Sequence, residues 1–140
     1  KNQRITGRSY FQFCLDIFSY FDTLIEFSFK AKIPYLAVIY AKKLFNNRQN
    51  EELTFKSARK DDIWLHASKV HGSHVIIACA GQNVPDDTIT QAAQLAAHYA
   101  ETTGGQNIPV DVTPVRQVKK IPNGKPGMVI YHTYKTVIVN

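Results

Sequence analysis

The sequence predicts an α+β fold, an antiparallel-rich sheet of about five strands packed by one main helix at about 86–103. Two short apolar runs, at 63–66 and 75–80, are bounded by turn residues and indicate neighbouring strands. One long stretch has apolar residues at helical spacing. Strand-like runs follow it, so the order ββ-α-βββ favours hairpins stacked on a single helix.

Residues 1–45 are predicted to form an aromatic-rich, amphipathic N-terminal appendage that is partly helical. Between 10 and 26 polar residues recur on one helical face, while Ile17, Phe21 and other apolar residues recur on the opposite face. Pro34 is expected to end helical structure, and 36–40 to enter the sheet as a strand. The aromatic stripe is interpreted as core or as partner-packing surface.

The first two strands are expected to join through a turn at 69–73. The main helix is expected to open at Asp87 or Thr88, because Thr88 and Gln91 have the spacing of a capping box. A glycine pair at 104–105 is typical of a helix end. Alanines along one face would let this helix approach the sheet closely.

Three further strands are predicted at 110–118, 128–131 and 135–139. Asn-Gly and Pro-Gly turns separate the first two of these strands. Residues 46–140 thus contain most of the predicted sheet and all of the main helix, and we expect them to form one domain.

Composition and cysteine usage favour a globular protein of a reducing compartment. The chain is 44% hydrophobic and 20% charged, as folded proteins are. Its two cysteines, Cys14 and Cys79, are far apart and form no C-x-x-C pair, so a disulfide scaffold is not expected. We expect a cytoplasmic location.

The sequence predicts no membrane insertion and suggests a longer parent protein. The apolar region 10–45 is interrupted by charges, and its uncharged run 33–41 is about half of the roughly 20 residues that a span requires. The chain begins with Lys1, and its one methionine is Met128. We therefore expect other domains in the parent protein.

Positive charge is concentrated at two places in the predicted domain. Residues 46–140 contain ten Lys or Arg and eight Asp or Glu, so the separation of the charges is more informative than their sum. The late cluster lies on a loop at 119–127 that prolines and glycines stiffen, and such a loop can present ammonium groups to phosphates. A solvated hairpin loop is the alternative. The candidate phosphate contacts are Arg48, Lys56, Arg59, Lys119, Lys120 and Lys125.

One strand carries an aromatic residue and a hydrogen-bond donor on the same face. Trp64 and His66 are two residues apart, so their side chains point the same way. The hairpin would also bring His74 near His66, and an imidazole can donate to phosphate or stack on a base. These three residues are predicted to shape or line a nucleic-acid site, and a structural role for the histidines remains equally open.

Metal binding and catalysis are not expected. His66, His71, His74 and Cys79 have the spacing H-x4-H-x2-H-x4-C, which is not that of a structural zinc site. Ser73 and His74 are adjacent, so on a strand they would point to opposite faces and could not act as nucleophile and base. We expect no catalytic residue, no metal and no cofactor.

The motifs from residue 46 onward resemble the NFACT-R domain, the C-terminal RNA-binding part of proteins historically labelled fibronectin-binding protein A. They keep their order along the chain, which makes the resemblance specific. The principal motifs are NNRQN at 46–50, DIWLH at 62–66, GSHVI at 72–76, VKK at 118–120 and KPGMVIY at 125–131.

The resemblance implies a role in ribosome-associated quality control. Such a module would bind tRNA or rRNA of large ribosomal subunits that carry stalled peptidyl-tRNA, and would not be an enzyme. Two other functions stay open: a DNA-binding or protein-docking module, which includes the historical fibronectin label, and a metal-dependent nucleic-acid hydrolase.

Overall fold

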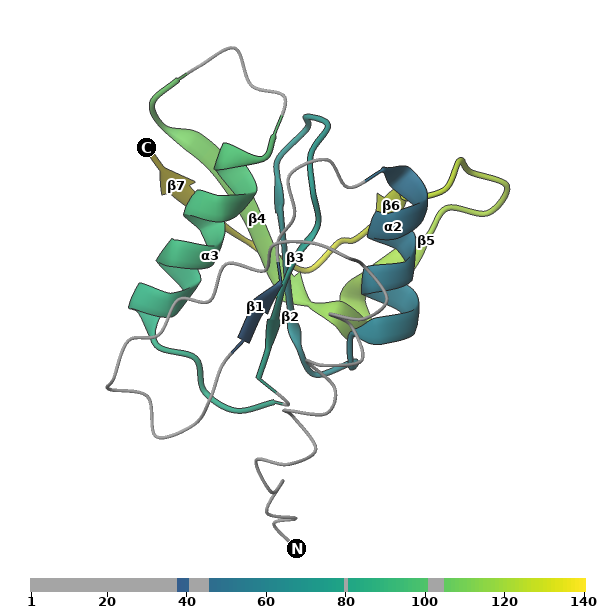
Figure 1. Cartoon of the computed structure of the whole chain (residues 1–140), viewed down its shortest axis with the longest axis horizontal. Coiled ribbons are helices and arrows are strands. Elements are labelled where there is room, and N and C mark those ends of the chain that lie inside the picture. Colours follow the sequence, from purple (N-terminus) through teal and green to yellow (C-terminus); the bar gives the residue numbers. More distant parts are fainter. Residues whose placement is uncertain (1–37, 41–45, 80, 101–104) are drawn as a thin grey trace, which may run out of the picture.

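The central element is a five-stranded antiparallel sheet with the strand order β1-β3-β2-β4-β7 (Figure 1). The computed structural model describes residues 38–40, 46–79, 81–100 and 105–140. The predicted α+β class is confirmed. The strands of the sheet are β1 Val38–Tyr40, β2 Ile63–Ala67, β3 Val75–Ala78, β4 Ile108–Pro114 and β7 Lys135–Val139.

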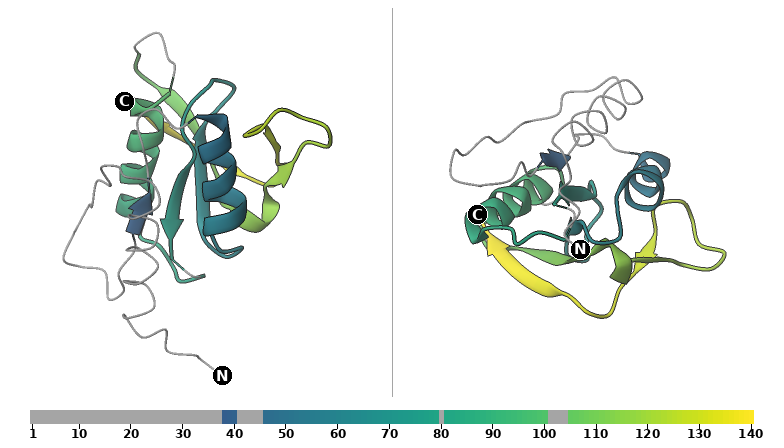
Figure 2. Two further views of the ribbon diagram at one scale, coloured as in Figure 1. Left: turned by 45° about the vertical axis from the view of Figure 1, so that its right-hand side comes forward. Right: turned by 90° about the horizontal axis from the view of Figure 1, so that it is seen from below.

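Helices cover both faces of this sheet (Figures 1 and 2). Helix α3, Asp86–His98, lies on one face, and helix α2, Asn47–Glu52, lies on the other and continues into the π-helical turn η1, Leu53–Ser57. A second, two-stranded sheet of β5 Lys119–Lys120 and β6 Val129–Ile130 lies beside α2. The sequence predicted one main helix, so α2 with η1 is an addition to the expected architecture.

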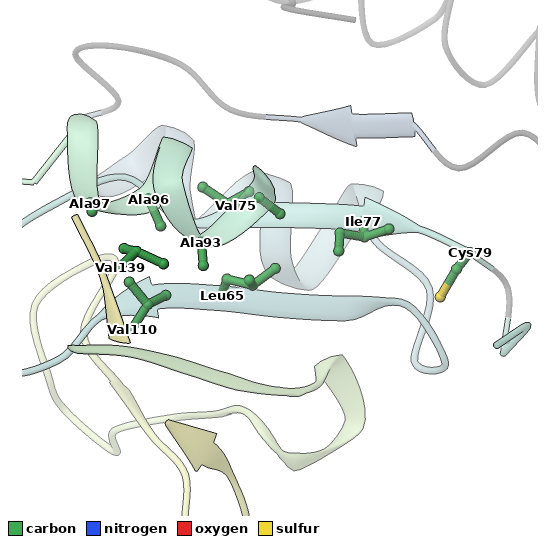
Figure 3. Packing of buried hydrophobic residues seen from close by; sticks show 10 residues of the cluster. Leu65, Val75, Ile77, Cys79, Ala93, Ala96, Ala97, Val110 and Val139 are labelled. Carbon is green, nitrogen blue, oxygen red and sulfur yellow. The ribbon is translucent and has the colours of Figure 1, made fainter. Parts of the chain in front are cut away.

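Strand alternation divides the core into two clusters. On the α3 face, small helix side chains allow close packing on the sheet (Figure 3). This cluster contains Leu65, Val75, Ile77, Cys79, Ala92, Ala93, Ala96, Ala97, Val110 and Val139. The intervening residues of β2 and β3 face α2 and η1. This second cluster contains Leu53, Trp64, Ile76, Ala78, Val115 and Val118.

Helix α3 was predicted at nearly the observed place, but both of its ends differ. It begins at Asp86 behind Pro85 without a side-chain cap, so the Thr88 capping box was wrong. The Thr88 amide already donates to the Pro85 carbonyl, at 3.0 Å, inside the first turn. The helix ends at His98 rather than near 103, because the backbone of Ala100 joins an antiparallel bridge with Gly72.

The strand predicted at 110–118 is divided. Strand β4 starts at Ile108 and ends at Pro114, after which a 3-10 turn, η2 Val115–Gln117, redirects the chain. The Val115 amide donates to the Asp62 carbonyl at 2.9 Å, so this turn is fixed to the start of β2.

An entering strand was predicted at 36–40; β1 confirms it over the described residues 38–40 and pairs with β3. The rest of the predicted amphipathic appendage, 1–37 and 41–45, lies outside the described residues. Within the described ranges, no helix has the length and apolar character needed to cross a bilayer.

Candidate nucleic-acid interface

The start of helix α2 is fixed to the β2–β3 hairpin by one buried amide. Asn46 caps the helix, accepting a hydrogen bond from the Gln49 amide at 2.8 Å. One turn later Asn50 donates from Nδ2 to the Gly72 carbonyl, at 3.2 Å, and accepts from the His74 amide, at 3.0 Å. The Asn50 side-chain amide therefore both donates to and accepts from the hairpin backbone, as the backbone of a neighbouring strand does.

Aromatic rings cluster on the face of this hairpin that packs against α2 and η1. The Trp64 ring stacks on His66 with centroids 5.6 Å apart and meets His74 edge-on at 5.1 Å. Tyr131 packs against Trp64 at 4.9 Å. Trp64 is fully buried, with 0% of its surface exposed. Its ring is therefore inaccessible from solvent and packs against His66 and Tyr131 from the core side.

Both histidines of this cluster are neutral at physiological pH. Burial lowers the pKa of His74 to about 3, and its Nδ1 lies 2.8 Å from the Thr54 hydroxyl oxygen. Burial also lowers the pKa of His66. The two rings lie opposite each other across the hairpin, with centroids 5.3 Å apart, as predicted. They can serve as hydrogen-bonding surfaces, but not as cations for phosphate.

The Asp111 carboxylate of β4 fixes the segment that follows β6. It accepts hydrogen bonds from the Tyr131 hydroxyl at 2.6 Å and from the Thr136 hydroxyl at 3.0 Å. Burial and the neighbouring carboxylate raise the pKa of Tyr131 above its usual value, so the phenol stays protonated and donates. The Tyr131 ring is therefore held in one position beside Trp64.

Glu51 ties the lysine-rich 119–127 loop to helix α2. Its carboxylate accepts from Lys120 Nζ at 2.8 Å and from the Gly127 amide at 3.1 Å. The hydrogen bond from Lys120 lowers the pKa of Glu51, and that from Gly127 adds to the effect. Lys120 Nζ also lies 5.3 Å from the centre of the Phe55 ring.

These elements line a half-open pocket of about 700 Å³ between α2, the β2–β3 turn and the segment 121–131. Lysines and histidines contribute most of its polar lining, and none of the described residues that line it is Asp or Glu. The lining includes Asn47, Asn50, His66, Lys69, His71, His74, Lys125 and Tyr131. A pocket of this composition is suited to an anionic or polar aromatic ligand.

The structure brings only some of the predicted site residues together. His66, His74 and Lys125 line the same pocket. Lys120 is engaged by Glu51, whereas its strand neighbour Lys119 is exposed. The late basic cluster therefore meets α2, the helix that carries Arg48.

The remaining predicted basic residues lie along the helical segment. Arg48 and Arg59 are exposed, Arg48 in the first turn of α2 and Arg59 beyond the end of η1. The exposed Lys56 is near Glu52, at 3.9 Å. A contact this long at the surface restrains Lys56 little. Arg48, Lys56 and Arg59 thus remain candidate contacts that lie outside the pocket.

Sequence reasoning missed Lys69, His71 and Tyr131, which also line the pocket. Lys69 sits in the β2–β3 turn with φ of 58°. A lysine in a polar turn has no distinguishing pattern, and the approach of this turn to 121–131 depends on tertiary structure. The start of helix α2 could have been predicted from the sequence, because Asn46 and Gln49 have the spacing of the capping box found in the structure.

The histidines and Cys79 do not form one metal site. Cys79 packs in the core beneath α3, while His66 and His74 lie on the opposite face of the sheet with Trp64. In the part of the chain that the structure describes, no three His, Cys, Asp or Glu side chains form a group that could hold a metal ion.

Comparison with known families decides the identity of the domain. The family described as NFACT protein RNA binding domain matches residues 27–133, which is most of the chain. The chain belongs to this family. This NFACT RNA-binding domain therefore carries its pocket on an RNA-binding scaffold.

Its relatives include proteins called Rqc2 homolog RqcH. The one from Bacillus subtilis (strain 168) is 49% identical over 96 residues, 67% of this chain and 16% of that protein. The one from Streptococcus pneumoniae (strain ATCC BAA-255 / R6) is 45% identical over 95 residues and 17% of its length. The chain thus spans about a sixth of these relatives.

A solved structure has the same fold. It is that of the C-terminal part of the fibronectin/fibrinogen-binding protein from Streptococcus suis, with a TM-score of 0.68 and 39% identity. The likeness covers 74% of this chain and 40% of that chain.

Proposed function

We propose that this NFACT RNA-binding domain binds tRNA or rRNA on large ribosomal subunits that carry stalled peptidyl-tRNA, as part of a cytoplasmic ribosome-associated quality control factor. The observation that carries the proposal is the pocket between α2 and 121–131, because its lining has lysines and histidines without a carboxylate among the described residues. Membership of an RNA-binding family and the names of the RqcH relatives support it.

The surface around the pocket supplies the phosphate contacts. Lys119 and Lys125 are exposed on the small sheet and its loop, and Arg48 is exposed on the adjoining helix. Such side chains neutralise phosphates irrespective of base sequence, so they position RNA without reading it. The domain holds RNA in place and catalyses no reaction on it.

Co-sedimentation with ribosomal subunits tests the proposal. The 140-residue chain is mixed with large subunits that carry peptidyl-tRNA, with vacant large subunits and with small subunits. We expect it to pellet with the first, and more weakly with the second. Equal pelleting with small subunits would contradict the proposal, because general attraction to RNA would then account for binding.

Protein docking is a second candidate function. Large hydrophobic side chains are exposed on and around β6 and β7, namely Met128, Ile130, Tyr134 and Ile138. Such side chains are common at protein interfaces. Immobilised fibronectin separates the two functions: capture that unlabelled RNA does not compete away would favour docking over RNA binding.

A further inference from the structure

We propose that the pocket holds one unpaired nucleotide of the bound RNA, with the base against His66 and Tyr131 and the flanking phosphates against Lys69 and Lys125. This inference rests on the proposed RNA binding and adds what the domain recognises in the RNA. The proposed site would hold a base that has turned out of the RNA helix, whereas phosphate contacts alone would recognise only the backbone.

The size and composition of the pocket fit such a ligand. Its volume of about 700 Å³ lies within the range of pockets that bury small organic molecules, about 300–1,000 Å³. Lys69 projects from the β2–β3 turn and Lys125 from the loop between β5 and β6, so cationic groups come from two separate elements of the wall. Phosphates on either side of one inserted nucleotide would meet both.

The deeper part of the pocket suits a base better than a phosphate. His66 and Tyr131 are half-buried, and burial lowers the pKa of His66, so it presents a neutral ring. Trp64 stacks on that ring and His74 meets it at a right angle, and His66 still lines the pocket. Neutral aromatic rings stack on bases of any sequence. A base in a duplex is already stacked and paired, so only an unpaired base can enter.

The walls of the pocket are fixed before any ligand binds. Asn50 holds the β2–β3 hairpin, and Glu51 holds the loop at Lys120 and Gly127. A preorganised pocket loses little conformational entropy when it is filled. A single nucleotide can therefore add appreciably to the affinity of the surrounding phosphate contacts.

Two RNA probes of nearly equal charge test the inference by fluorescence anisotropy with the 140-residue chain. One is a fully paired duplex, and the other is the same duplex with a single bulged adenosine. We expect the bulged RNA to bind about tenfold more tightly, the effect of one stacked base. Val70→Phe, which fills the pocket from its lining, and His66→Ala should each reduce this preference to about twofold or less.

His98→Ala is the matched control, because His98 is exposed on α3 at the other face of the sheet. It should retain the tenfold preference, and the thermal transition of each variant is checked first. Equal binding of both RNAs by the wild-type chain would overturn the proposed nucleotide site while leaving the proposed function in place. Binding of neither RNA would overturn both. A preference that survives in folded Val70→Phe and His66→Ala variants would place the nucleotide elsewhere and overturn the inference.

Discussion

Gly127 occupies a position that only glycine fits. Its φ is +80°, and a Cβ built there would lie 2.7 Å from the Asn47 carbonyl oxygen. Gly127→Ala should therefore lower the free energy of unfolding by about 1–3 kcal/mol, measured by urea denaturation. Gly105→Ala is the control, since no atom of the described residues lies within 4 Å of its Cβ position, and it should change stability by less than about 0.5 kcal/mol. Equal effects of the two substitutions would refute the close contact with α2.

Because His74 is buried, the free energy of unfolding should depend on pH. Its pKa of about 3 in the folded state lies below the ordinary value of 6.5, so protons bind preferentially to the unfolded chain. The stabilisation is complete above about pH 6.5 and is lost as the pH falls, by roughly 2 kcal/mol at pH 5. His66 adds to the loss, because its pKa is also lowered.

Urea denaturation between pH 7.5 and 5 measures this loss. His74→Gln should have a flatter dependence, since the titrating group is gone, whereas His98→Gln should keep the wild-type dependence. A His74→Gln variant that loses as much stability as wild type over this range would show that other groups cause the decline.

At the residue scale, sequence predicted contacts that follow from strand periodicity and missed those that tertiary structure creates. Trp64 and His66 share a face because they are two positions apart, and pairing across the hairpin brings His74 opposite His66. Lys69 and Tyr131 reach the same pocket from segments far apart in the chain. No local pattern encodes that approach.

At the scale of elements, the Asn50 side chain links helix α2 to the β2–β3 hairpin, and removing that side chain should weaken the link. Asn50→Ala leaves the buried His74 amide without its partner, so we expect the free energy of unfolding to fall by about 2 kcal/mol or more. Asn46→Ala, which removes only an exposed helix cap, should cost about 1 kcal/mol.

Hydrogen exchange gives a second measurement of the same link. The His74 amide should exchange faster in Asn50→Ala than in Asn46→Ala. Similar exchange in both variants would show that the hairpin does not depend on α2.

The existence of the elements was easier to predict than their ends. The periodicity of α3 identifies the helix, but its C-terminus depends on the bridge between Gly72 and Ala100, which lies outside the helix sequence. Similarly, Pro114 divides a continuous strand-like run because the next residues bond to the start of β2. Helix α2 with η1 is short, so we expect it to depend on burial of Leu53 in the cluster with Trp64 more than on helical propensity.

At the scale of the whole molecule, the boundary predicted at residue 46 separates β1 from the sheet that it joins. A chain of residues 38–140 retains every described element, so we expect a cooperative thermal transition. A chain of residues 46–140 lacks β1 and leaves the edge of β3 unpaired, so its melting temperature should be lower. Equal melting temperatures would place the domain boundary at 46 as the sequence suggested.

Lysines beside α2 are proposed to hold RNA by its phosphates, and the salt dependence of RNA affinity tests this most directly. If Lys119 and Lys125 each contact a phosphate, replacing both by alanine should reduce the slope of log K against log salt by about 1.5. A matched double variant, Lys60→Ala with Lys135→Ala, removes the same charge at two positions that are not candidate phosphate contacts and should keep the wild-type slope. A wild-type slope in the Lys119 and Lys125 variant, with both proteins folded, would contradict the account.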